Sequence, residues 1–204
     1  MFTGIVESVG KIVDIKHIDE QSGLQLEIEA RDLKLSDTKI GDSISVQGAC
    51  MTVSNLNLKL NSFSVIVSKQ SLKSTTGLNC INEVNLEKSL YANSRLGGHF
   101  LLGHIDSLGK IKSLSSVGNS LELVLCIQND IARYLVYKGP IAVNGISLTI
   151  NKIIKEKDNF EVSMNIIPHT IINTTIRNEK IENLVNIEVD ILARYVENFS
   201  KKIL

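Results

Sequence analysis

Hydrophobic and polar residues alternate, or apolar residues run together, over short stretches along the whole chain. Residues 24–30 ("LQLEIEA") and 121–127 ("LELVLCI") show this pattern over the length of a β-strand, and so do residues 63–68 and 160–167. Gly, Asn, Asp and Ser residues separate these stretches, as they do at turns. The pattern therefore predicts many short strands and few helices.

The strand pattern occurs twice, in two units of about 90 residues each. "GIVESVGKI" (4–12) matches "GHIDSLGKI" (103–111), "SISVQGACMTV" (43–53) matches "PIAVNGISLTI" (140–150), and "VNLE" (84–87) matches "VNIE" (185–188). The blocks keep their order and lie about 100 residues apart, which indicates an internal duplication. Half a dozen short strands per unit favour a small closed barrel or a sandwich, because closure removes exposed strand edges.

Helical signals are few. Residues 30–35 ("ARDLKL") and 128–139 occupy equivalent places in the two units and could each form one or two helical turns, and residues 87–101 form a plausible linker. Asp190 is a reasonable N-cap for a C-terminal helix. That helix would carry an apolar stripe made of Ile191, Leu192, Tyr195, Val196, Phe199 and Ile203. It either folds back on its own barrel or packs against copies of itself in an oligomer, and we favour the second.

Composition narrows the class of protein without giving a function. The 204 residues carry a formal net charge of zero and the Lys and Arg residues are scattered, so neither nucleic acid nor an anionic membrane is indicated. The N-terminus lacks a signal-peptide pattern, and no apolar run approaches the roughly 20 residues of a membrane helix. Cys50, Cys80 and Cys126 are widely spaced, which predicts no disulfide framework or zinc site and fits a reducing cytoplasm.

Candidate chemistry lies in the doubled phrase "VQGACMT" and "VNGISLT". Period-2 alternation puts Cys50 and Thr52 on one strand face, with Ser147 and Thr149 in the matching places. A glycine within a strand marks a bulge or a close approach by a ligand, so the glycine of each phrase could open its barrel to a ligand. Alternatively, these small residues only line a barrel beside a bulge, and the sequence leaves both interpretations open.

Two histidines are further candidates. His104 stands in the second unit where the first has Ile5, and His99 lies beside the linker. Cys50 with a histidine could form a nucleophilic pair, although sequence spacing does not fix their distance. No histidine and carboxylate spacing predicts a metal site, and there is no glycine-rich phosphate loop or nucleophile elbow.

Four segments together resemble riboflavin synthase of the alpha-chain type over nearly the whole chain: "MFTGIVE", the doubled phrase, "GGHFLLGHID" and "IIPHTIINTT". The resemblance implies an all-β fold of two tandem six-stranded Greek-key β-barrels, followed by a C-terminal amphipathic helix. It implies a lumazine-binding barrel with the linker in residues 1–96, a second in 97–189, and an oligomerisation helix in 190–204. It also implies a homotrimer without metal or organic cofactor, and lumazine synthase is a candidate further partner.

That family converts two molecules of 6,7-dimethyl-8-ribityllumazine into riboflavin and 5-amino-6-(D-ribitylamino)uracil by moving a four-carbon unit, so the resemblance implies a transferase. The reacting pair would lie between the N-terminal barrel of one subunit and the C-terminal barrel of its neighbour. Two identical substrates would need two similar cradles, and their positioning would supply much of the rate. The alternatives are a non-catalytic lumazine- or flavin-binding relative of the same fold and a purely structural double barrel.

The resemblance also carries over candidate site residues by motif. The first pocket would use Gly4, Ile5, Val6, Cys50, Met51, Thr52 and a strand of Ile66, Val67, Ser68, Lys69, Gln70 and Ser71. The second would use Gly103, His104, Ile105, Ser147, Leu148, Thr149 and a strand of Asn165, Ile166, Ile167, Pro168, His169 and Thr170. Lys138 would meet the neighbour's ligand, and Phe2, expected at a mobile N-terminus, would help complete the site. Cys50, His104, Ser43 and Thr149 match positions proposed for catalysis, and we favour Cys50 and His104.

The chain departs from the family pattern mainly in its first unit. Gln47 replaces the usual asparagine of the phrase, Ile66 stands at an Asp-like position, and "KQSL" at residues 69–72 replaces a Pro-Glu-Thr-Leu-like motif. The second unit keeps its proline but has His169 where glutamate is usual. The first pocket is therefore expected to be the less typical of the two.

Overall fold

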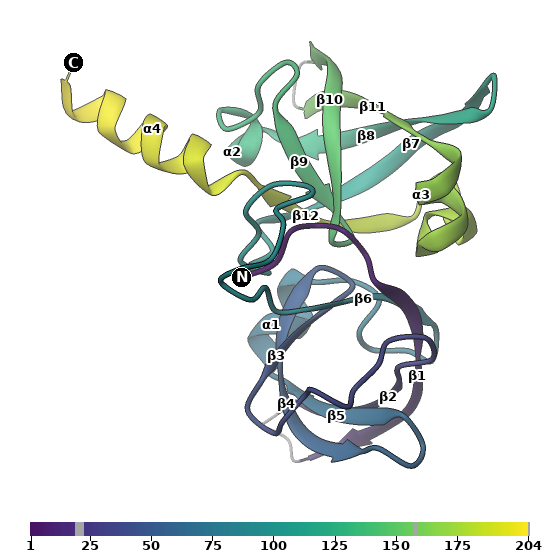
Figure 1. Ribbon diagram of the computed structural model, residues 1–204. Helices are drawn as coiled ribbons and strands as arrows, with labels where there is room; N and C mark the ends of the chain where they lie inside the picture. Colours follow the sequence, from purple (N-terminus) through teal and green to yellow (C-terminus); the bar gives the residue numbers. More distant parts are fainter. Residues whose placement is uncertain (19–22, 157–158, 204) are drawn as a thin grey trace.

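The computed structural model describes residues 1–18, 23–156 and 159–203, and it consists of two β-barrels and one projecting helix (Figure 1). The first barrel contains β1 (Ser8–His17), β2 (Leu24–Glu29), β3 (Ser43–Val46), β4 (Ala49–Asn57), β5 (Ser62–Val67) and β6 (Glu83–Lys88). The second contains β7 (Ser107–Val117), β8 (Ser120–Gln128), β9 (Pro140–Val143), β10 (Ile146–Lys155), β11 (Asn159–Ile166) and β12 (Leu184–Val189).

Both barrels close in the same strand order. The first runs β1-β2-β5-β4-β3-β6 and closes where β6 pairs with β1, and the second repeats this order as β7-β8-β11-β10-β9-β12. Neighbouring strands are antiparallel, and the non-sequential order is that of a Greek key. The predicted pair of six-stranded barrels is confirmed, and the sequence repeat is a duplication of a whole barrel.

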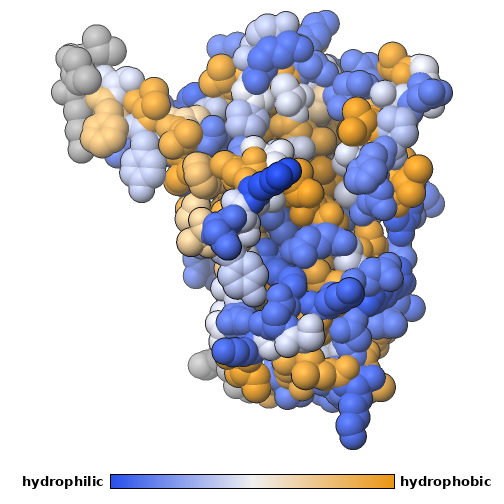
Figure 2. Space-filling view, in the orientation of Figure 1, coloured by the Kyte–Doolittle hydropathy of each residue, from blue (hydrophilic) through white to orange (hydrophobic). Residues whose placement is uncertain are grey.

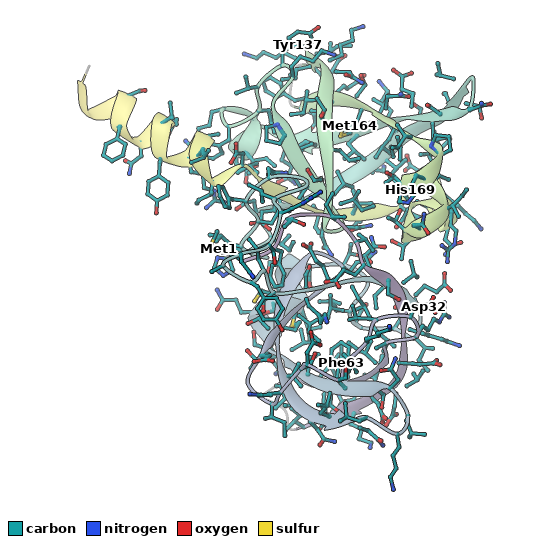
Figure 3. The ribbon with its side chains drawn as sticks, viewed as in Figure 1. Met1, Asp32, Phe63, Tyr137, Met164 and His169 are labelled. Carbon is teal, nitrogen blue, oxygen red and sulfur yellow. The ribbon has the colours of Figure 1, made fainter. Side chains whose placement is uncertain are left out.

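Each barrel interior is filled by the apolar half of its alternating strands. On β4, Ala49, Met51 and Val53 are buried in the core, whereas Thr52 between them is exposed. Phe63 lies inside the ring of the first barrel, and Met164 is buried in the second (Figure 3). Both interiors are therefore packed cores, and the polar residues of the doubled phrase face outward.

The two expected pocket strands end earlier than the sequence predicts. β5 and β11 end at Val67 and Ile166, and the short helices α1 (Lys69–Ser74) and α3 (Pro168–Asn173) begin two residues later. The prediction of strands over residues 66–71 and 165–170 is therefore wrong. The Ser68 side chain caps the first turn of α1, and Pro168 occupies the first turn of α3, where a missing N–H costs nothing.

Of the two further helical turns expected, one forms. Residues 30–35 form turns without a helix, whereas the equivalent part of the second unit contains α2 (Asn129–Ala132). A 3-10 turn, η1 (Thr175–Asn178), follows α3. These short elements connect strands and leave the barrels unchanged.

The C-terminal helix α4 (Ile191–Ile203) points away from both barrels (Figure 1). It begins as predicted after Asp190, whose Oδ1 accepts the N–H of Leu192 at 3.0 Å. Four side chains of the predicted stripe are 57–66% exposed, namely Leu192, Tyr195, Val196 and Phe199. Figure 2 shows apolar side chains along the helix, so its own barrel does not cover this face. The side chain of Ile203 lies outside the described part of the chain.

The barrels meet through the tight turns of the doubled phrase. In Gln47–Gly48 and Asn144–Gly145, both residues have positive φ, as two-residue type I′ hairpin loops require. A Cβ on Gly48 would lie 2.6 Å from the main-chain nitrogen of Gly145. The glycines therefore let the barrels approach each other, and the expectation that they open each barrel to a ligand is wrong.

Amide side chains fasten these turns in the same way on both sides. Gln47 Oε1 accepts the N–H of Asn85 at 2.9 Å, and Asn144 Oδ1 accepts the N–H of Asn186 at 2.8 Å. Asn85 and Asn186 then donate across the barrel boundary to the main-chain oxygens of Asn144 and Gln47, each at 2.9 Å. Gln47 thus makes the same hydrogen bond in the first turn as Asn144 makes in the second.

Candidate active site

Two chain segments, residues 4–6 and 102–106, pass from one barrel to the other, and we call them the crossing segments. They determine which candidate residues lie together. The carbonyl oxygen of Gly4, from the first unit, accepts the N–H of Ser147 in the second barrel at 2.8 Å. The carbonyl oxygen of Gly103, from the second unit, accepts the N–H of Cys50 in the first barrel at 2.8 Å. Val6 accordingly packs against the core of the second barrel, and Ile105 against the core of the first.

The expected grouping of the two pockets is therefore wrong in this respect. Residues 4–6 lie at Ser147 and residues 103–105 lie at Cys50, each opposite to the prediction. Both crossing glycines have positive φ, and a Cβ on Gly103 would lie 2.6 Å from the nitrogen and Cβ of Cys50. The close main-chain approach is possible because neither glycine has a side chain.

The outer side of β3, β4 and β5 forms a surface that we call the first face. It carries Ser43, Cys50, Thr52 and Ile66, and His104 follows Gly103 in the segment that docks on Cys50. Ser43 pairs directly with Thr52 across β3 and β4, so their side chains lie on the same side of the sheet. Cys50 and Ser43 are half-buried, whereas Thr52, Ile66 and His104 are exposed. Residues 68–71 follow at the start of α1, and Ser71 is the half-buried one among them.

The matching side of β10 and β11 is the second face. It carries Ser147, Thr149, Asn165 and Ile167. Ile5 follows Gly4 in the segment that docks on Ser147, and its side chain lies near Gly97. Ser147 is half-buried and the other four are exposed. Pro168, His169 and Thr170 follow in α3, where Figure 3 labels His169. The two faces differ clearly at one matched position, where the first face has Ile66 and the second has Asn165.

Four predicted contact residues on the barrel strands do not present their side chains on either face. Met51, Val67, Leu148 and Ile166 point into the barrel cores and are at most 7% exposed. A ligand on the outer faces can therefore meet these residues only through the main chain.

Phe2 lies at the boundary between the two crossing segments. Its side chain is 1% exposed, and its main chain exchanges two hydrogen bonds with Leu101, at 2.8 and 3.1 Å. Phe2, Leu101 and Ala142 form a small apolar cluster against which Cys50 packs. The expectation of a mobile N-terminus is wrong, but Phe2 does lie next to a favoured catalytic residue.

Buried carboxylates at matching places hold the crossing segments. Glu87 on β6 accepts the N–H groups of Thr3 and Gly4 at 2.6 and 3.0 Å, and Glu188 on β12 accepts those of residues 102–103 at 2.7 and 2.9 Å. Burial raises the pKa of both carboxyls, that of Glu188 to about 7. Sequence reasoning did not select them, although each ends one copy of the matched block "VNLE" and "VNIE".

His99 pairs with the serine of the doubled phrase. Its Nδ1 lies 2.7 Å from Ser147 Oγ, and burial lowers the pKa of the ring, which is therefore neutral near pH 7. Its buried Nε2 has no hydrogen-bond partner within the described residues. His104 instead follows Gly103, whose carbonyl oxygen accepts the main-chain N–H of Cys50.

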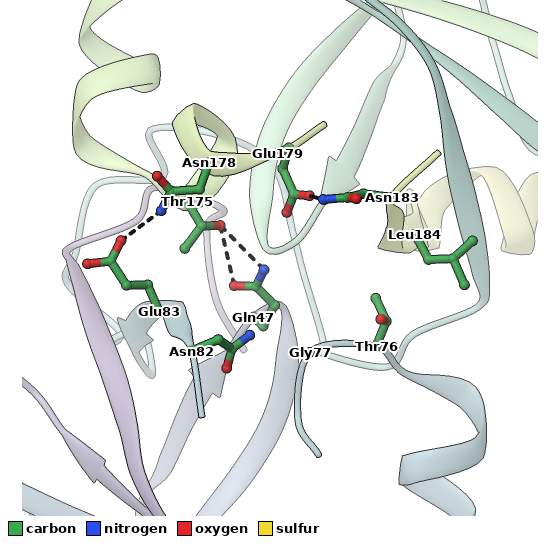
Figure 4. A pocket seen from close by; sticks show the side chains of 10 residues that line it. All are labelled: Gln47, Thr76, Gly77, Asn82, Glu83, Thr175, Asn178, Glu179, Asn183 and Leu184. Atoms are coloured by element: carbon green, nitrogen blue, oxygen red, sulfur yellow. Dashed lines mark hydrogen bonds between the residues drawn. The ribbon is translucent and has the colours of Figure 1, made fainter. Parts of the chain in front are cut away.

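A polar cleft of about 520 Å³ opens elsewhere, at the amide joint between the barrels (Figure 4). Gln47 and Thr175 bond to each other there, and Glu83 is bonded by Arg177 and Asn178. None of the candidate site residues lines this cleft. Most of its polar side chains bond one another, although the buried Oδ1 of Asn82 has no partner within the described residues. We regard the cleft as part of the joint and assign the candidate site to the two faces.

Lys138 lies on the loop before β9 and is exposed, with Nζ 3.0 Å from Asn151 Oδ1. Its ammonium group is thus accessible to another molecule. In residues 1–18, 23–156 and 159–203, no group of three His, Cys, Asp or Glu side chains could hold a metal ion. Over the same residues, no helix is long and apolar enough to cross a membrane.

Comparison with known proteins identifies the class to which these two barrels belong. A family model described as a lumazine binding domain matches residues 3–89 and again 102–190, so each barrel is one such domain. Riboflavin synthase of Photobacterium phosphoreum is 38% identical over 97% of this chain and 88% of its own length. That of Bacillus subtilis is 36% identical, over 99% and 91%. The chain belongs to the riboflavin synthase family and is an enzyme of this type.

Solved structures give the same fold. LumP in complex with riboflavin has a TM-score of 0.79 with this chain at 24% identity, covering 93% of this chain and 99% of LumP. LumP in complex with 6,7-dimethyl-8-(1'-D-ribityl) lumazine has a TM-score of 0.77 at 23% identity, with the same coverage.

Proposed function

We propose that the protein converts two molecules of 6,7-dimethyl-8-ribityllumazine into one riboflavin and one 5-amino-6-(D-ribitylamino)uracil, passing a four-carbon unit between them. The observation that carries this proposal is the pair of matched outer faces, each completed by a segment of the other unit. Two copies of one substrate fit two similar faces. Holding them together gives a large gain in rate through proximity and orientation.

The catalytic residues in this proposal are Cys50, His104, Ser43 and Thr149. The donor must lose a proton from the methyl group on C7, and the acceptor needs a nucleophile at its own C7. The bond between Gly103 and Cys50 supports a joint role for Cys50 and His104. Thr149 would act from the second face of the neighbouring subunit.

The remaining face residues would bind substrate. Main-chain groups where β5 meets α1, and where β11 meets α3, suit the pyrimidine edge of a lumazine. Hydroxyl groups such as those of Thr52 and Ser147 suit the ribityl chain. Because Ile66 is apolar and Asn165 is an amide, the two faces would hold the ribityl chain differently.

The site would be shared between subunits of a homotrimer in the cytoplasm. The exposed apolar face of α4 supports assembly through these helices, because an unpaired apolar stripe of this kind gains most when it is covered. Lys138 would then reach the ligand of the neighbouring subunit. Lumazine synthase stays a candidate partner.

The test is an assay of the purified protein with 6,7-dimethyl-8-ribityllumazine and no added cofactor. We expect the lumazine signal in absorbance and fluorescence to fall while riboflavin appears at half the molar amount, as the stoichiometry requires. Heat-denatured protein is the control. Tight binding of both compounds without conversion would favour the alternative, a non-catalytic binding protein of the same fold.

A further inference from the structure

Glu188 belongs to the second barrel but holds the segment that completes the first face. Its two oxygens accept the N–H groups of Leu102 and Gly103 at 2.7 and 2.9 Å. The next residue is His104, and the carbonyl oxygen of Gly103 docks on the N–H of Cys50 at 2.8 Å. One carboxylate of β12 is therefore connected to both favoured catalytic residues of the other barrel.

Glu87 makes the reciprocal arrangement. It lies on β6 of the first barrel and accepts the N–H groups of Thr3 and Gly4 and the hydroxyl of Thr3, at 2.6, 3.0 and 2.7 Å. The carbonyl oxygen of Gly4 docks on Ser147 of the second barrel. Each barrel thus fixes, with one carboxylate, the segment that lies on the face of the other.

The crossing segment at residues 102–106 has few main-chain bonds near His104. It belongs to no helix or strand, so no ladder of main-chain bonds fixes its path. Around His104 its anchors are the pairing of Leu101 with Phe2, the bond to Cys50 and the carboxylate of Glu188. The far end is held separately, because Asp106 bonds the main chain of Ile187 and Val189 on β12. Removing the carboxylate leaves the main chain before His104 with two fewer charge-assisted hydrogen bonds.

We propose that Glu188 is a positioning residue for the first face and Glu87 for the second, each acting across the barrel boundary through the main chain of a crossing segment. The inference rests on the proposed function, because it names what positions that site. An ionised carboxylate is suited to this task because each of its two oxygens accepts one N–H, whereas an amide has a single acceptor.

Burial makes these carboxylates costly to keep. Desolvation is the main cause that raises the pKa of both, and the hydrogen bonds that they accept from the crossing segments act in the opposite direction. Perturbed ionisable groups of this kind concentrate at functional sites. If these contacts served only stability, neutral side chains could hold the crossing segments with a smaller desolvation penalty.

A double-mutant cycle in the full-length protein tests the assignment. The variants are Glu188→Gln, Glu87→Gln, His104→Ala and the two combinations with His104→Ala, and the measured quantity is kcat/KM for the lumazine. We expect Glu188→Gln to lower kcat/KM about tenfold to a hundredfold. Added to His104→Ala, it should cost clearly less than it does alone, because part of its effect passes through His104 and only the rest through the docking of Gly103 on Cys50. The fold-loss in kcat/KM from Glu87→Gln should instead multiply with that from His104→Ala, because Glu87 acts on the other face.

The outcomes separate this inference from the proposed function. If the wild-type protein makes riboflavin but the losses of Glu188→Gln and His104→Ala multiply, the positioning role is overturned while the function stands. Wild-type turnover in Glu188→Gln, or a loss in Glu188→Gln when His104→Ala is neutral, overturns it equally. Should the wild-type protein make no riboflavin, the proposed function fails, and the same cycle is read from riboflavin affinity by fluorescence quenching. If Glu188→Gln does not fold, as judged by circular dichroism, Glu188→Asp takes its place, since the shorter side chain cannot reach both N–H groups.

Discussion

The main-chain N–H of Cys50 donates to the carbonyl oxygen of Gly103 at 2.8 Å, joining the first barrel to a segment of the second unit. Ser147 and Gly4 make the reciprocal bond. Neither face is therefore complete within one repeat, and the duplication works as a pair of interlocked units. Changes at the crossing segments should affect both stability and the candidate chemistry.

Gly103→Ala should damage the protein at this crossing. The new Cβ would lie 2.6 Å from the Cys50 nitrogen and Cβ, and the residue would have to keep a φ of +75°. We expect a loss of about 3 kcal/mol in the free energy of unfolding, measured in urea, together with reduced turnover. Gly118→Ala is the matched control, because Gly118 also has positive φ but open space around its Cβ position. It should cost only about 1 kcal/mol. Equal losses in the two variants would show that crowding at Cys50 is unimportant.

Asn186→Ala should weaken the joint between the barrels. The buried carboxamide donates to the main-chain oxygens of Gln47 and Thr76 and accepts the N–H of Thr76, at 2.9, 3.1 and 2.7 Å. Its removal leaves these main-chain groups without partners, so we expect a loss of about 3 kcal/mol in unfolding free energy. Asn183→Ala, at an exposed asparagine nearby, should cost less than about 1 kcal/mol. A loss as small in Asn186→Ala would mean that water replaces the amide.

The architecture could be predicted because its signals are local. Alternation within strands such as β4 encodes the barrel cores, and the doubled phrase encodes the second barrel. The docking of Gly4 and Gly103 on the barrel of the other unit could not be predicted, because a main-chain bond between distant segments leaves no pattern in the side chains. The starts of α1 and α3 were missed although Ser68 and Pro168 are local signals, since the preceding apolar runs continue the strand pattern.

Glu188 should make stability depend on pH. Its folded-state pKa is about 7 against an ordinary 4.5, so the folded protein binds the proton more tightly than the unfolded chain. The resulting stabilisation is fully present below about pH 4.5, is lost as pH rises to about 7, and amounts to about 3 kcal/mol. His99 acts in the opposite direction, because its lowered pKa destabilises the fold as pH falls. The difference in unfolding free energy between wild type and Glu188→Gln isolates Glu188. If that difference does not vary between pH 5 and pH 8, the prediction is wrong.

The exposed face of α4 should determine the oligomeric state. We expect Val196→Ser with Phe199→Ser, or deletion of the residues after Asp190, to yield monomers with little activity, because the shared site would be lost. Sedimentation velocity and the lumazine assay measure the two effects. Asn198→Ser, at an exposed polar position of the same helix, should leave both unchanged. A fully active monomer would contradict the shared-site argument.

The divergence between Cys50 and Ser147 should be functional. A reaction between two identical molecules makes one the donor and the other the acceptor, so reactive positions on two otherwise matched faces need not be alike. Cys50 packs against the cluster around Phe2 and lies at the segment that carries His104, whereas Ser147 Oγ bonds the neutral ring of His99 at 2.7 Å. We therefore expect Cys50→Ser to lower kcat about tenfold or more, since a thiol ionises far more readily than a hydroxyl.

Ser147→Cys is the reciprocal variant and should act on binding. Sulfur is a weaker hydrogen-bonding partner for His99 than the serine hydroxyl, so we expect KM for the lumazine to rise while kcat changes little. Steady-state kinetics of the two single variants distinguishes the roles, with circular dichroism to establish that both fold. If Cys50→Ser turns over at the wild-type rate, the difference between Cys50 and Ser147 is neutral divergence of the duplicated copies. The asymmetry of the reaction must then arise from another difference between matched positions of the two units. Ile66 is matched by Asn165, and His104 is matched by Ile5.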